Sequence, residues 1–286
     1  MVAANRDEFH DRLAAPASWW DATGVADAGG PAWLFGGRDL QGGGTWLGLR
    51  RVADGSLRMA ALTNLRPGLM PAAALMPVEP GAPPSRGKLV CGYLSSESDP
   101  GNYLRTLDPP PGAFAGFNLL AISVAPPGGV VEGWYLNNLP GAQARRLTPG
   151  LHLVSNATLD VPWPKTRLLE AAMLRALAGG SSEAEDEARQ AAARPETRGD
   201  EWQLAATLLA ALGDRTEAAE SELPRTGLCQ ERERLLSSPF IVDGHYGTRC
   251  STVLLVSRGG QVHYVERSFG PHGRHLGTVT ERFVTA

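Results

Sequence analysis

Three pairs of short apolar segments, each joined by a tight glycine-containing turn, most strongly limit the folds open to this chain of 286 residues. Such pairs are typical of β-hairpins. Hairpins that follow one another build antiparallel sheets, which argues against the alternating strands and helices of a doubly wound parallel sheet. The pairs are 45–52 with 57–63 around Asp54-Gly55, 114–124 with 130–137 around PPGG, and 248–257 with 261–269 around Arg258-Gly259-Gly260.

Helical spacing replaces this pattern in the middle of the chain. Residues 164–177 form an amphipathic helix in this interpretation, and 202–212 form another that Gly213 ends. A shorter helix is predicted over 87–96. The apolar face predicted for the first helix consists of Leu168, Leu169, Ala172, Met173, Ala176 and Leu177.

The remaining segments divide into short strands and polar connections. Residues 1–8 are typical of a strand already under way, 151–156 of a short buried strand, and 278–284 of a last strand. Residues 66–86 contain six prolines and predict a long surface loop. Residues 179–199 are alanine-rich and charged, and we expect a partly helical, partly flexible insert there.

Neither half of the chain holds a complete set of strands and covering helices. We therefore predict one α+β domain over 1–286, with two stacked antiparallel sheets and helices outside them. The glycines Gly42 to Gly44 lack the Gly-Lys-Ser/Thr ending of a phosphate-binding loop and lead into a strand. They predict a tight turn before the first hairpin, with Trp46 as a core anchor.

Composition excludes several classes of protein. Twenty-seven Lys and Arg against 30 Asp and Glu give a net charge of −3, which offers no electrostatic case for nucleic acid. No apolar segment approaches the roughly 20 residues that cross a bilayer. Three cysteines without pattern and a start unlike a signal peptide predict a reducing, cytoplasmic location. His272, His275 and His263 lie near one another in sequence without acidic companions, so no metal site is predicted.

A dense polar cluster, Asn5-Arg6-Asp7-Glu8, follows the first apolar residues. On a strand, Arg6 and Glu8 face one way while Asn5 and Asp7 face the other. If Asp7 points into the fold, its carboxylate needs a cationic or amide partner. The alternative, a solvated turn with a local ion pair, is the more common role of such a cluster.

Three further residues lie at predicted strand ends. Asn64 and Asn156 each follow an apolar segment and a hydroxyl residue, so they could either donate amides to an oxyanion or cap turns. Arg249 begins an apolar strand. It could bind a carboxylate, from a substrate or from Asp7, or lie on the surface at a sheet edge.

Together these motifs resemble the NRDE family, also called the Transport and Golgi organisation family. The resemblance spans nearly the whole chain, and the order of the motifs makes it specific. The motifs are AANRDEF at 3–9, GGTWLG at 43–48, ALTN at 61–64, RG at 86–87, GFNL at 116–119, LTPG at 147–150, SN at 155–156, PWPK at 162–165, YGTR at 246–249 and ERS at 266–268.

This resemblance implies a four-layer αββα fold like that of N-terminal-nucleophile hydrolases of the choloylglycine hydrolase type. In those hydrolases a processed N-terminal cysteine attacks an amide. By resemblance, Arg6 and Asp7 would orient the nucleophile, Asn64 and Asn156 would form the oxyanion site, and Arg249 would stabilise charge nearby. Asn5 and Glu8 complete the polar cluster.

One departure bears on function. Family members usually begin with Met-Cys and a strand before the ANRDE strand, whereas residue 2 here is Val2. We expect that the first strand and its cysteine are missing from this chain. Either a Met-Cys start lies upstream, or this form is inactive.

Two functions from different classes follow from the resemblance. One is a non-catalytic trafficking protein for haem or a hydrophobic metabolite, which needs no cofactor and takes haem only as cargo. The other is a cysteine amidohydrolase that acts on linear C–N bonds. We favour the trafficking protein, because the chain as it stands has no N-terminal thiol.

Overall fold

The computed structural model describes residues 1–25, 33–69, 84–107, 113–126, 129–177 and 200–285. This part of the chain forms two compact units. Unit 1 consists of Met1–Asp11, Pro162–Ser257 and Gln261–Val284, and unit 2 is built around Arg12–Val161. The chain therefore leaves unit 1 after the first strand and returns to it for the second half of the sequence.

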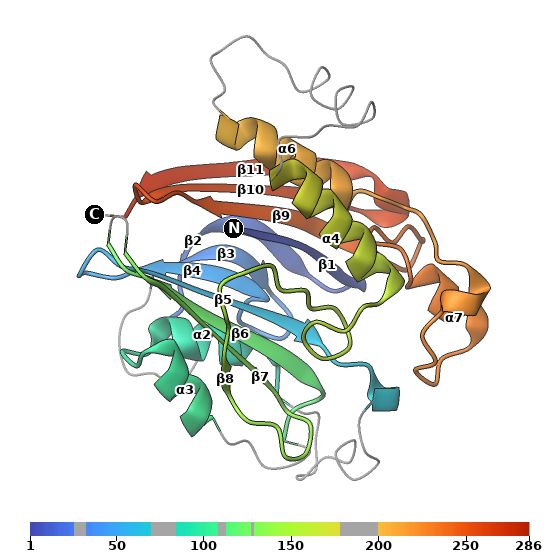
Figure 1. Cartoon of the computed structure of the whole chain (residues 1–286), viewed down its shortest axis with the longest axis horizontal. Coiled ribbons are helices and arrows are strands. Elements are labelled where there is room, and N and C mark those ends of the chain that lie inside the picture. Colours follow the sequence, from blue (N-terminus) through green and yellow to red (C-terminus); the bar gives the residue numbers. More distant parts are fainter. Residues whose placement is uncertain (26–32, 70–83, 108–112, 127–128, 178–199, 286) are drawn as a thin grey trace. The chain divides into compact units, whose positions relative to one another are not determined.

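Unit 1 contains a four-stranded antiparallel sheet in the order β1-β9-β10-β11, so the first strand pairs with the second-half hairpin. Helices α4 and α6 lie over one face of this sheet (Figure 1). Its elements are β1 (Val2–Phe9), α4 (Pro164–Leu177), α6 (Asp200–Leu212), η2 (Glu220–Glu222), α7 (Gln230–Leu235), β9 (Tyr246–Val256), β10 (Gln261–Phe269), η3 (Pro271–Gly273) and β11 (His275–Val284).

Apolar residues of α6 pack this helix onto the sheet. Leu208 and Leu209 share a core with Val253 and Val265 of the two central strands. Ala205 and Leu212, one helical turn away on either side, extend the same stripe along the helix. The predicted helix over 202–212 and the predicted hairpin over 248–269 are thereby confirmed.

Helix α4 occurs where the sequence predicts it, but its buried face is narrower. Leu169 and Met173 pack against the core that α6 shares. Leu168 and Leu177, predicted on the same face, are 39% and 53% exposed. Because a single neighbouring helix covers only one stripe of a helical surface, the outer edges of a wide apolar face stay in water.

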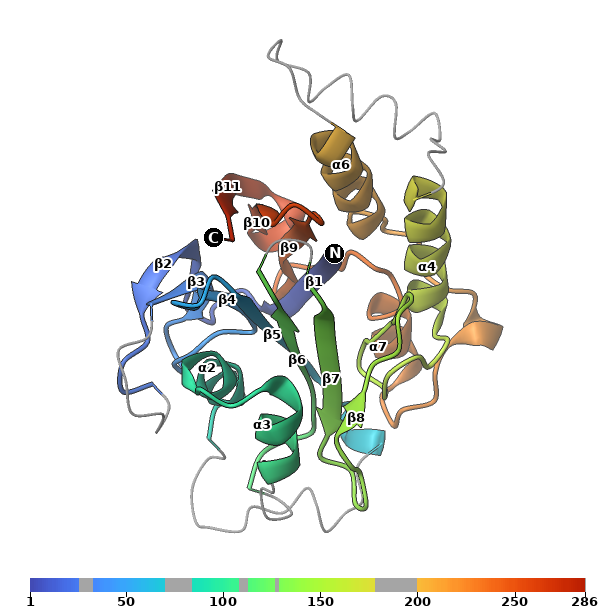
Figure 2. The same cartoon turned by 60° about the vertical axis from the view of Figure 1, so that its left-hand side comes forward.

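Unit 2 contains a seven-stranded antiparallel sheet in the order β2-β3-β4-β5-β6-β7-β8. Helices α2 and α3 lie against one face of this sheet, over its strands from β4 to β7 (Figure 2). Its elements are β2 (Ala14–Asp21), β3 (Trp33–Asp39), β4 (Leu47–Arg51), β5 (Leu57–Asn64), η1 (Pro67–Leu69), α2 (Gly87–Ser95), α3 (Pro100–Thr106), β6 (Phe117–Val124), β7 (Val131–Asn137) and β8 (Arg145–Arg146).

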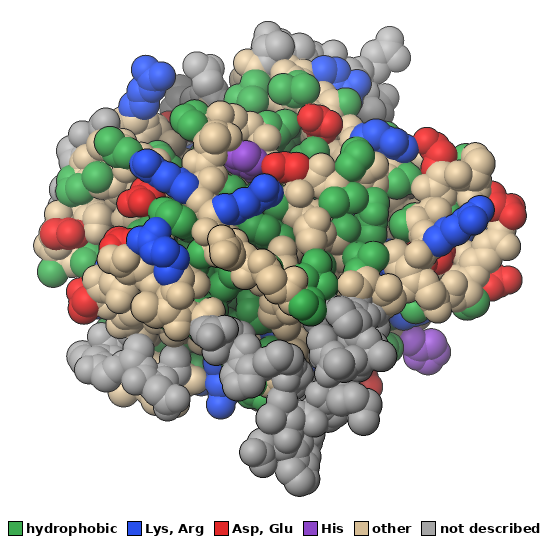
Figure 3. Space-filling view, turned by 60° about the horizontal axis from the view of Figure 1, so that its bottom comes forward, with side chains coloured by type: hydrophobic (Ala, Val, Ile, Leu, Met, Phe, Trp, Pro, Cys, Tyr) green, Lys and Arg blue, Asp and Glu red, His purple; other side chains and the backbone are tan. Residues whose placement is uncertain are grey.

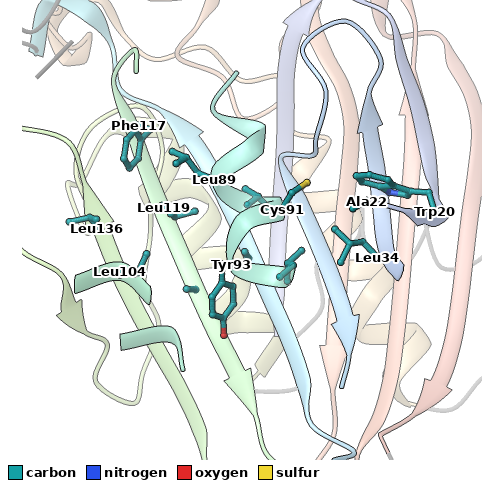
Figure 4. Close-up of a cluster of buried hydrophobic side chains, with 14 residues drawn as sticks. Trp20, Ala22, Leu34, Leu89, Cys91, Tyr93, Leu104, Phe117, Leu119 and Leu136 are labelled. Carbon is teal, nitrogen blue, oxygen red and sulfur yellow. The ribbon is translucent and has the colours of Figure 1, made fainter. Parts of the chain in front are cut away.

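The core of unit 2 lies beneath α2 and α3. Tyr93 and Cys91 of α2 are fully buried, as are Phe117 and Leu119 of β6. Figure 4 shows these side chains with Leu104 of α3 between the helices and the sheet. The predicted hairpins β4-β5 and β6-β7 and the predicted helix α2 are confirmed.

Several elements depart from the predictions. Residues 151–156 form no strand, because their backbone groups bond to side chains and to a loop instead of a ladder. Strands β2 and β3 were not predicted, since Pro16 and a register shift interrupt the alternation of β2. Helix α3 also escaped prediction, although Asp99 caps it and Pro100 opens it.

Glycines before the first hairpin serve the backbone, as predicted. Gly43 and Gly44 have φ of 70° and 84°, in the left-handed region. A Cβ at Gly44 would lie 2.6 Å from the carbonyl of Gly87, at the start of α2. Trp46 is half-buried and lies against Gly37, so it packs at the margin of the core.

Three predictions remain as predictions after this description. They are the single domain, the four-layer αββα stacking and the insert at 179–199, which lies outside the described residues. Among the described helices, none is both long enough and apolar enough to cross a bilayer. On the face drawn in Figure 3, basic and acidic side chains are interspersed with hydrophobic ones.

Candidate functional site

In unit 1, the polar cluster of β1 lies beside the start of β9. Asn5 pairs with Ser251, Arg6 with Cys250 and Asp7 with Thr248, so the register skips Arg249. Arg249 is therefore the extra residue of a β-bulge. Bulges redirect a side chain out of the regular alternation and are common beside functional sites.

Asn5 has a structural task. Its amide nitrogen donates to the carbonyls of Leu212 and Pro239, both at 2.8 Å, and its oxygen accepts a bond from the Ser251 hydroxyl at 2.6 Å. Leu212 is the last residue of α6, where helix carbonyls lack partners within the helix. Asn5 thus ties the helix end to the sheet.

Asp7 is held by a hydroxyl group. Its carboxylate accepts a bond from Thr248 Oγ1 at 2.7 Å, and the same oxygen of Thr248 accepts from the Ile241 amide. Burial raises the pKa of Asp7, although the positive charge of Lys165 and the Thr248 bond act to lower it. Lys165, itself buried, belongs to the PWPK segment at the start of α4.

Replacing Asp7 by Asn is expected to stabilise the protein near neutral pH. A raised folded-state pKa means that ionised Asp7 costs stability, and this cost grows as pH rises from the unfolded value of 3.8 through the folded value. Each pKa unit corresponds to about 1.4 kcal/mol. Urea unfolding of the Asp7→Asn protein at pH 7 and pH 4 measures the effect, since Asn can still accept the Thr248 bond.

The stabilisation by Asp7→Asn should be smaller at pH 4. At that pH Asp7 is largely protonated in the folded state and partly protonated in the unfolded state, so little energy is lost to a buried negative charge. Asp214→Asn serves as the control. Asp214 lies partly exposed in a loop, and its carboxylate accepts a hydrogen bond from the Thr216 amide. Equal stability of wild type and Asp7→Asn at pH 7 would contradict the argument.

Two arginines lie close together at the bulge. Burial lowers the pKa of Arg249, and the positive charge of Arg6 lowers it further, while Glu8 and Asp11 partly offset the effect. The guanidinium of Arg249 donates to the Phe9 carbonyl at 2.6 Å. Two neighbouring guanidinium groups favour an anion between or beside them, and a carboxylate suits their planar geometry.

Neither of the two buried cysteines is an activated nucleophile in this arrangement. Burial raises the pKa of Cys250 well above its usual range, and the charge of Glu266 adds to the shift. Burial likewise raises the pKa of Cys91 to about 11. Cys229 is exposed and precedes α7, whose first turn is acidic. A thiolate nucleophile needs an accessible, electropositive environment, and the buried Cys91 and Cys250 have none.

In unit 2, Asn64 and Asn156 meet. The Asn156 amide nitrogen donates to the backbone carbonyl of Asn64 at 3.0 Å. The Arg66 amide donates to the Asn156 carbonyl, also at 3.0 Å, which fastens the two segments side by side. Within the described part of the chain, the Asn64 side-chain amide takes part in no hydrogen bond, so its donors are available to a ligand.

A buried network beneath these residues determines the path of the 155–159 segment. Asn118, 1% exposed, donates to Thr63 Oγ1 at 3.0 Å and to the Ala157 carbonyl at 2.8 Å, and accepts from the Tyr135 hydroxyl at 2.5 Å. Thr63 in turn donates to the Ser155 carbonyl at 2.6 Å. Side chains of β5 and β6 therefore bond the carbonyls of residues 155 and 157, which would otherwise pair with a neighbouring strand.

The predicted site residues fall into two groups. Asn5, Arg6, Asp7, Glu8 and Arg249 lie together at one end of the β1-β9 pair in unit 1. Asn64 and Asn156 lie together in unit 2. The convergence of both groups on one cleft stays a prediction.

Sequence reasoning missed two residues that shape these groups. Lys165 supplies the positive charge near Asp7, and its signal was a lysine at the start of a helix, where the helix dipole disfavours a cation. Asn118 organises the Asn64–Asn156 segment, and its signal was an asparagine inside an otherwise apolar strand.

Among the residues that the structure describes, no group of three His, Cys, Asp or Glu side chains could hold a metal ion. His263, one of the three histidines considered above, is buried and stacks on Trp202 with ring centroids 5.5 Å apart. His275 bonds to Thr278 at the start of β11.

Two comparisons with known proteins cover nearly the whole chain. The family model described as Transport and Golgi organisation 2 matches residues 1–271. A Bos taurus protein named Transport and Golgi organization protein 2 homolog is 32% identical over 299 residues, which cover 99% of this chain and 91% of that protein. The Transport and Golgi organization 2 homolog of Mus musculus and the Transport and Golgi organization protein 2 homolog of Homo sapiens are each 28% identical over 64% of this chain and 61% of theirs.

Proposed function

Because this chain belongs to the Transport and Golgi organisation 2 family, we propose that it binds and carries a hydrophobic molecule bearing a carboxylate. Haem, with its two propionates, is the first candidate, and a hydrophobic acid is the second. In this proposal the protein carries the molecule and breaks none of its covalent bonds. The names of the relatives refer to transport, which agrees with such a role.

The observation that carries this proposal is the pair of arginines at the bulge. Arg249 is lifted out of the strand alternation, and its pKa is lowered by burial and then by Arg6. A carboxylate beside the two guanidinium groups would add charge-assisted hydrogen bonds to the interactions that they already make. The raised pKa values of Cys91 and Cys250 support binding over thiol chemistry.

Ligand titration tests the proposal. We expect the protein to bind haem, followed by absorbance or by quenching of tryptophan fluorescence, and to bind haem dimethyl ester more weakly. Arg249→Gln should weaken haem binding about tenfold or more, since a hydrogen bond to a charged group contributes about 1.5–3 kcal/mol. The same change should leave the already weak ester binding nearly unaltered.

Arg258→Gln is the matched control. Arg258 lies in the exposed turn at the other end of β9 and should not affect affinity. Equal affinities for haem and its dimethyl ester would overturn the carboxylate argument. A parallel titration with long-chain fatty acids and their methyl esters separates haem from other hydrophobic acids.

A second function, hydrolysis of an amide bond, is favoured by one observation. Asn64 and Asn156 meet at the end of β5, and the Asn64 amide donors are available to a developing oxyanion. Release of amine from N-acyl amide substrates tests this function. Turnover that is lost in Asn64→Ala but kept in Asn102→Ala would replace the carrier proposal by the hydrolase.

The proposal extends to the surroundings in which the protein works. The three cysteines are free thiols, which suits a reducing cytoplasm. We propose that binding needs no resident cofactor, so the protein purified in the presence of a chelator should keep its affinity for the ligand.

A further inference from the structure

The loop that was expected to be a strand is closed by a histidine–aspartate pair. His152 Nδ1 lies 3.0 Å from Asp160 Oδ2, and His152 Nε2 lies 2.8 Å from the Thr148 carbonyl oxygen. The His152 ring is partly covered, whereas Asp160 is more open to water. Both nitrogens of one imidazole ring therefore face oxygen atoms within hydrogen-bond distance.

Only the doubly protonated ring satisfies this arrangement. A carbonyl oxygen and an ionised carboxylate accept hydrogen bonds and donate none. A neutral imidazole carries a single N–H, so one of its two nitrogens would face an acceptor with a lone pair. The geometry therefore requires His152 in its imidazolium form.

Asp160 closes the same loop through its backbone. Its amide donates to the Leu153 carbonyl at 2.6 Å, and its second carboxylate oxygen accepts from the Leu153 amide at 2.9 Å. Asp160 also adopts φ of 64°, a left-handed conformation that, after glycine, asparagine and aspartate tolerate best. Three hydrogen bonds with His152 and Leu153 hold it there.

This closure surrounds the segment that reaches the end of β5. Between Leu153 and Asp160 lie the Ser155 carbonyl, bonded by Thr63, and the Ala157 carbonyl, bonded by Asn118. Asn156, between those two carbonyls, donates to Asn64. Neutral hydrogen bonds thus hold the buried side of the loop. The outer side is held by His152 and Asp160, and His152 can lose its positive charge.

We propose that His152 and Asp160 form a proton-dependent latch that closes the outer half of the 148–160 loop, while neutral hydrogen bonds hold Asn156 at the end of β5. In the protonated state both ring nitrogens donate and the loop is closed. Loss of the proton removes one of the two bonds and the attraction to Asp160, and the outer half of the loop opens. The inference goes beyond ligand binding and requires no particular ligand.

The charges that face His152 agree with this direction. Partial burial acts to lower the pKa of His152, but the Thr148 carbonyl and the Asp160 carboxylate raise it above its ordinary value. Arg145 of β8 is the neighbouring cation and opposes the rise. Since the folded pKa is raised, the latch stabilises the loop below about pH 6.5 and this stabilisation is lost as pH rises through the folded value.

Hydrogen exchange on the full chain tests the latch. The Leu153 and Asp160 amides donate inside the latch, whereas the Leu159 amide donates to the buried Tyr135 hydroxyl. After correction for intrinsic exchange, protection of the first two should fall about two- to five-fold between pH 6 and pH 9, the range of exposed ion pairs. Protection of Leu159 should stay nearly constant.

Two variants complete the test. Asp160→Asn keeps a residue that tolerates positive φ, and it should lower the pKa of His152 measured by NMR and abolish the pH dependence of loop protection. His275→Gln is the control, since the His275 ring bonds the Thr278 hydroxyl and packs against Phe269. If the His152 titration is unchanged in Asp160→Asn, or if wild-type protection is the same at pH 6 and pH 9, the latch is wrong.

Discussion

Asn118→Ala is expected to destabilise the protein by about 3–5 kcal/mol. The change removes an amide that bonds Thr63, the Ala157 carbonyl and the Tyr135 hydroxyl in a buried network. Each buried polar group left without a partner costs about 1–3 kcal/mol, and members of a network strengthen one another. The midpoint of urea unfolding should shift strongly with little change in slope.

Asn102→Ala provides the matched control for this prediction. The Asn102 side chain lies on the exposed side of α3 and donates to the capping Asp99, so its loss should cost less than about 1 kcal/mol. The Asn118 variant should also lose hydrogen-exchange protection at Leu159, whose amide depends on Tyr135. A cost near that of the control would show that the network does not hold the 155–159 segment.

Gly44→Ala is expected to cost about 3–5 kcal/mol, far more than Gly43→Ala at about 1 kcal/mol. Both glycines have left-handed φ, so both substitutions meet the same conformational penalty. Only at Gly44 would the new methyl group lie 2.6 Å from a backbone carbonyl, that of Gly87. Backbone cannot move aside as a flexible side chain does, so overpacking adds to the cost.

Thermal unfolding of the two variants separates these contributions, because Gly43 has open space where a Cβ would stand. Equal losses of stability in the two variants would mean that positive φ alone accounts for both glycines. The close approach of Gly44 to the start of α2 would then contribute nothing to stability. A variant that fails to accumulate can be compared after refolding, with Gly43→Ala treated in the same way.

Local signals explain why the hairpins could be predicted. Asp54-Gly55 sets a turn between two apolar segments, and the structure pairs Leu57 with Arg51 directly across it. The helices over 164–177 and 202–212 follow from apolar spacing in the same local way. Each of these elements is specified by residues that lie within a few positions of one another.

Elements without a local signal escaped prediction. The 151–156 segment is apolar enough to read as a strand, but Thr63 and Asn118 bond its carbonyls from a distance in sequence. The bulge at Arg249 depends on how β1 pairs with β9, which are separated by more than 230 residues. Neither strand has a sequence pattern that predicts the register between β1 and β9.

The sequence by itself determined the antiparallel hairpins, the helical middle and the family to which the chain belongs, because turn residues and apolar spacing act over short distances. It also identified Asn64 and Asn156 as related residues, and the structure places them in contact. Only the tertiary structure decided that Asn5 caps α6, that Asp7 is held by Thr248 with Lys165 nearby, and that His152 closes a loop. Those roles depend on which polar groups meet after folding, and each buried donor or acceptor takes whatever partner the long-range packing brings within reach.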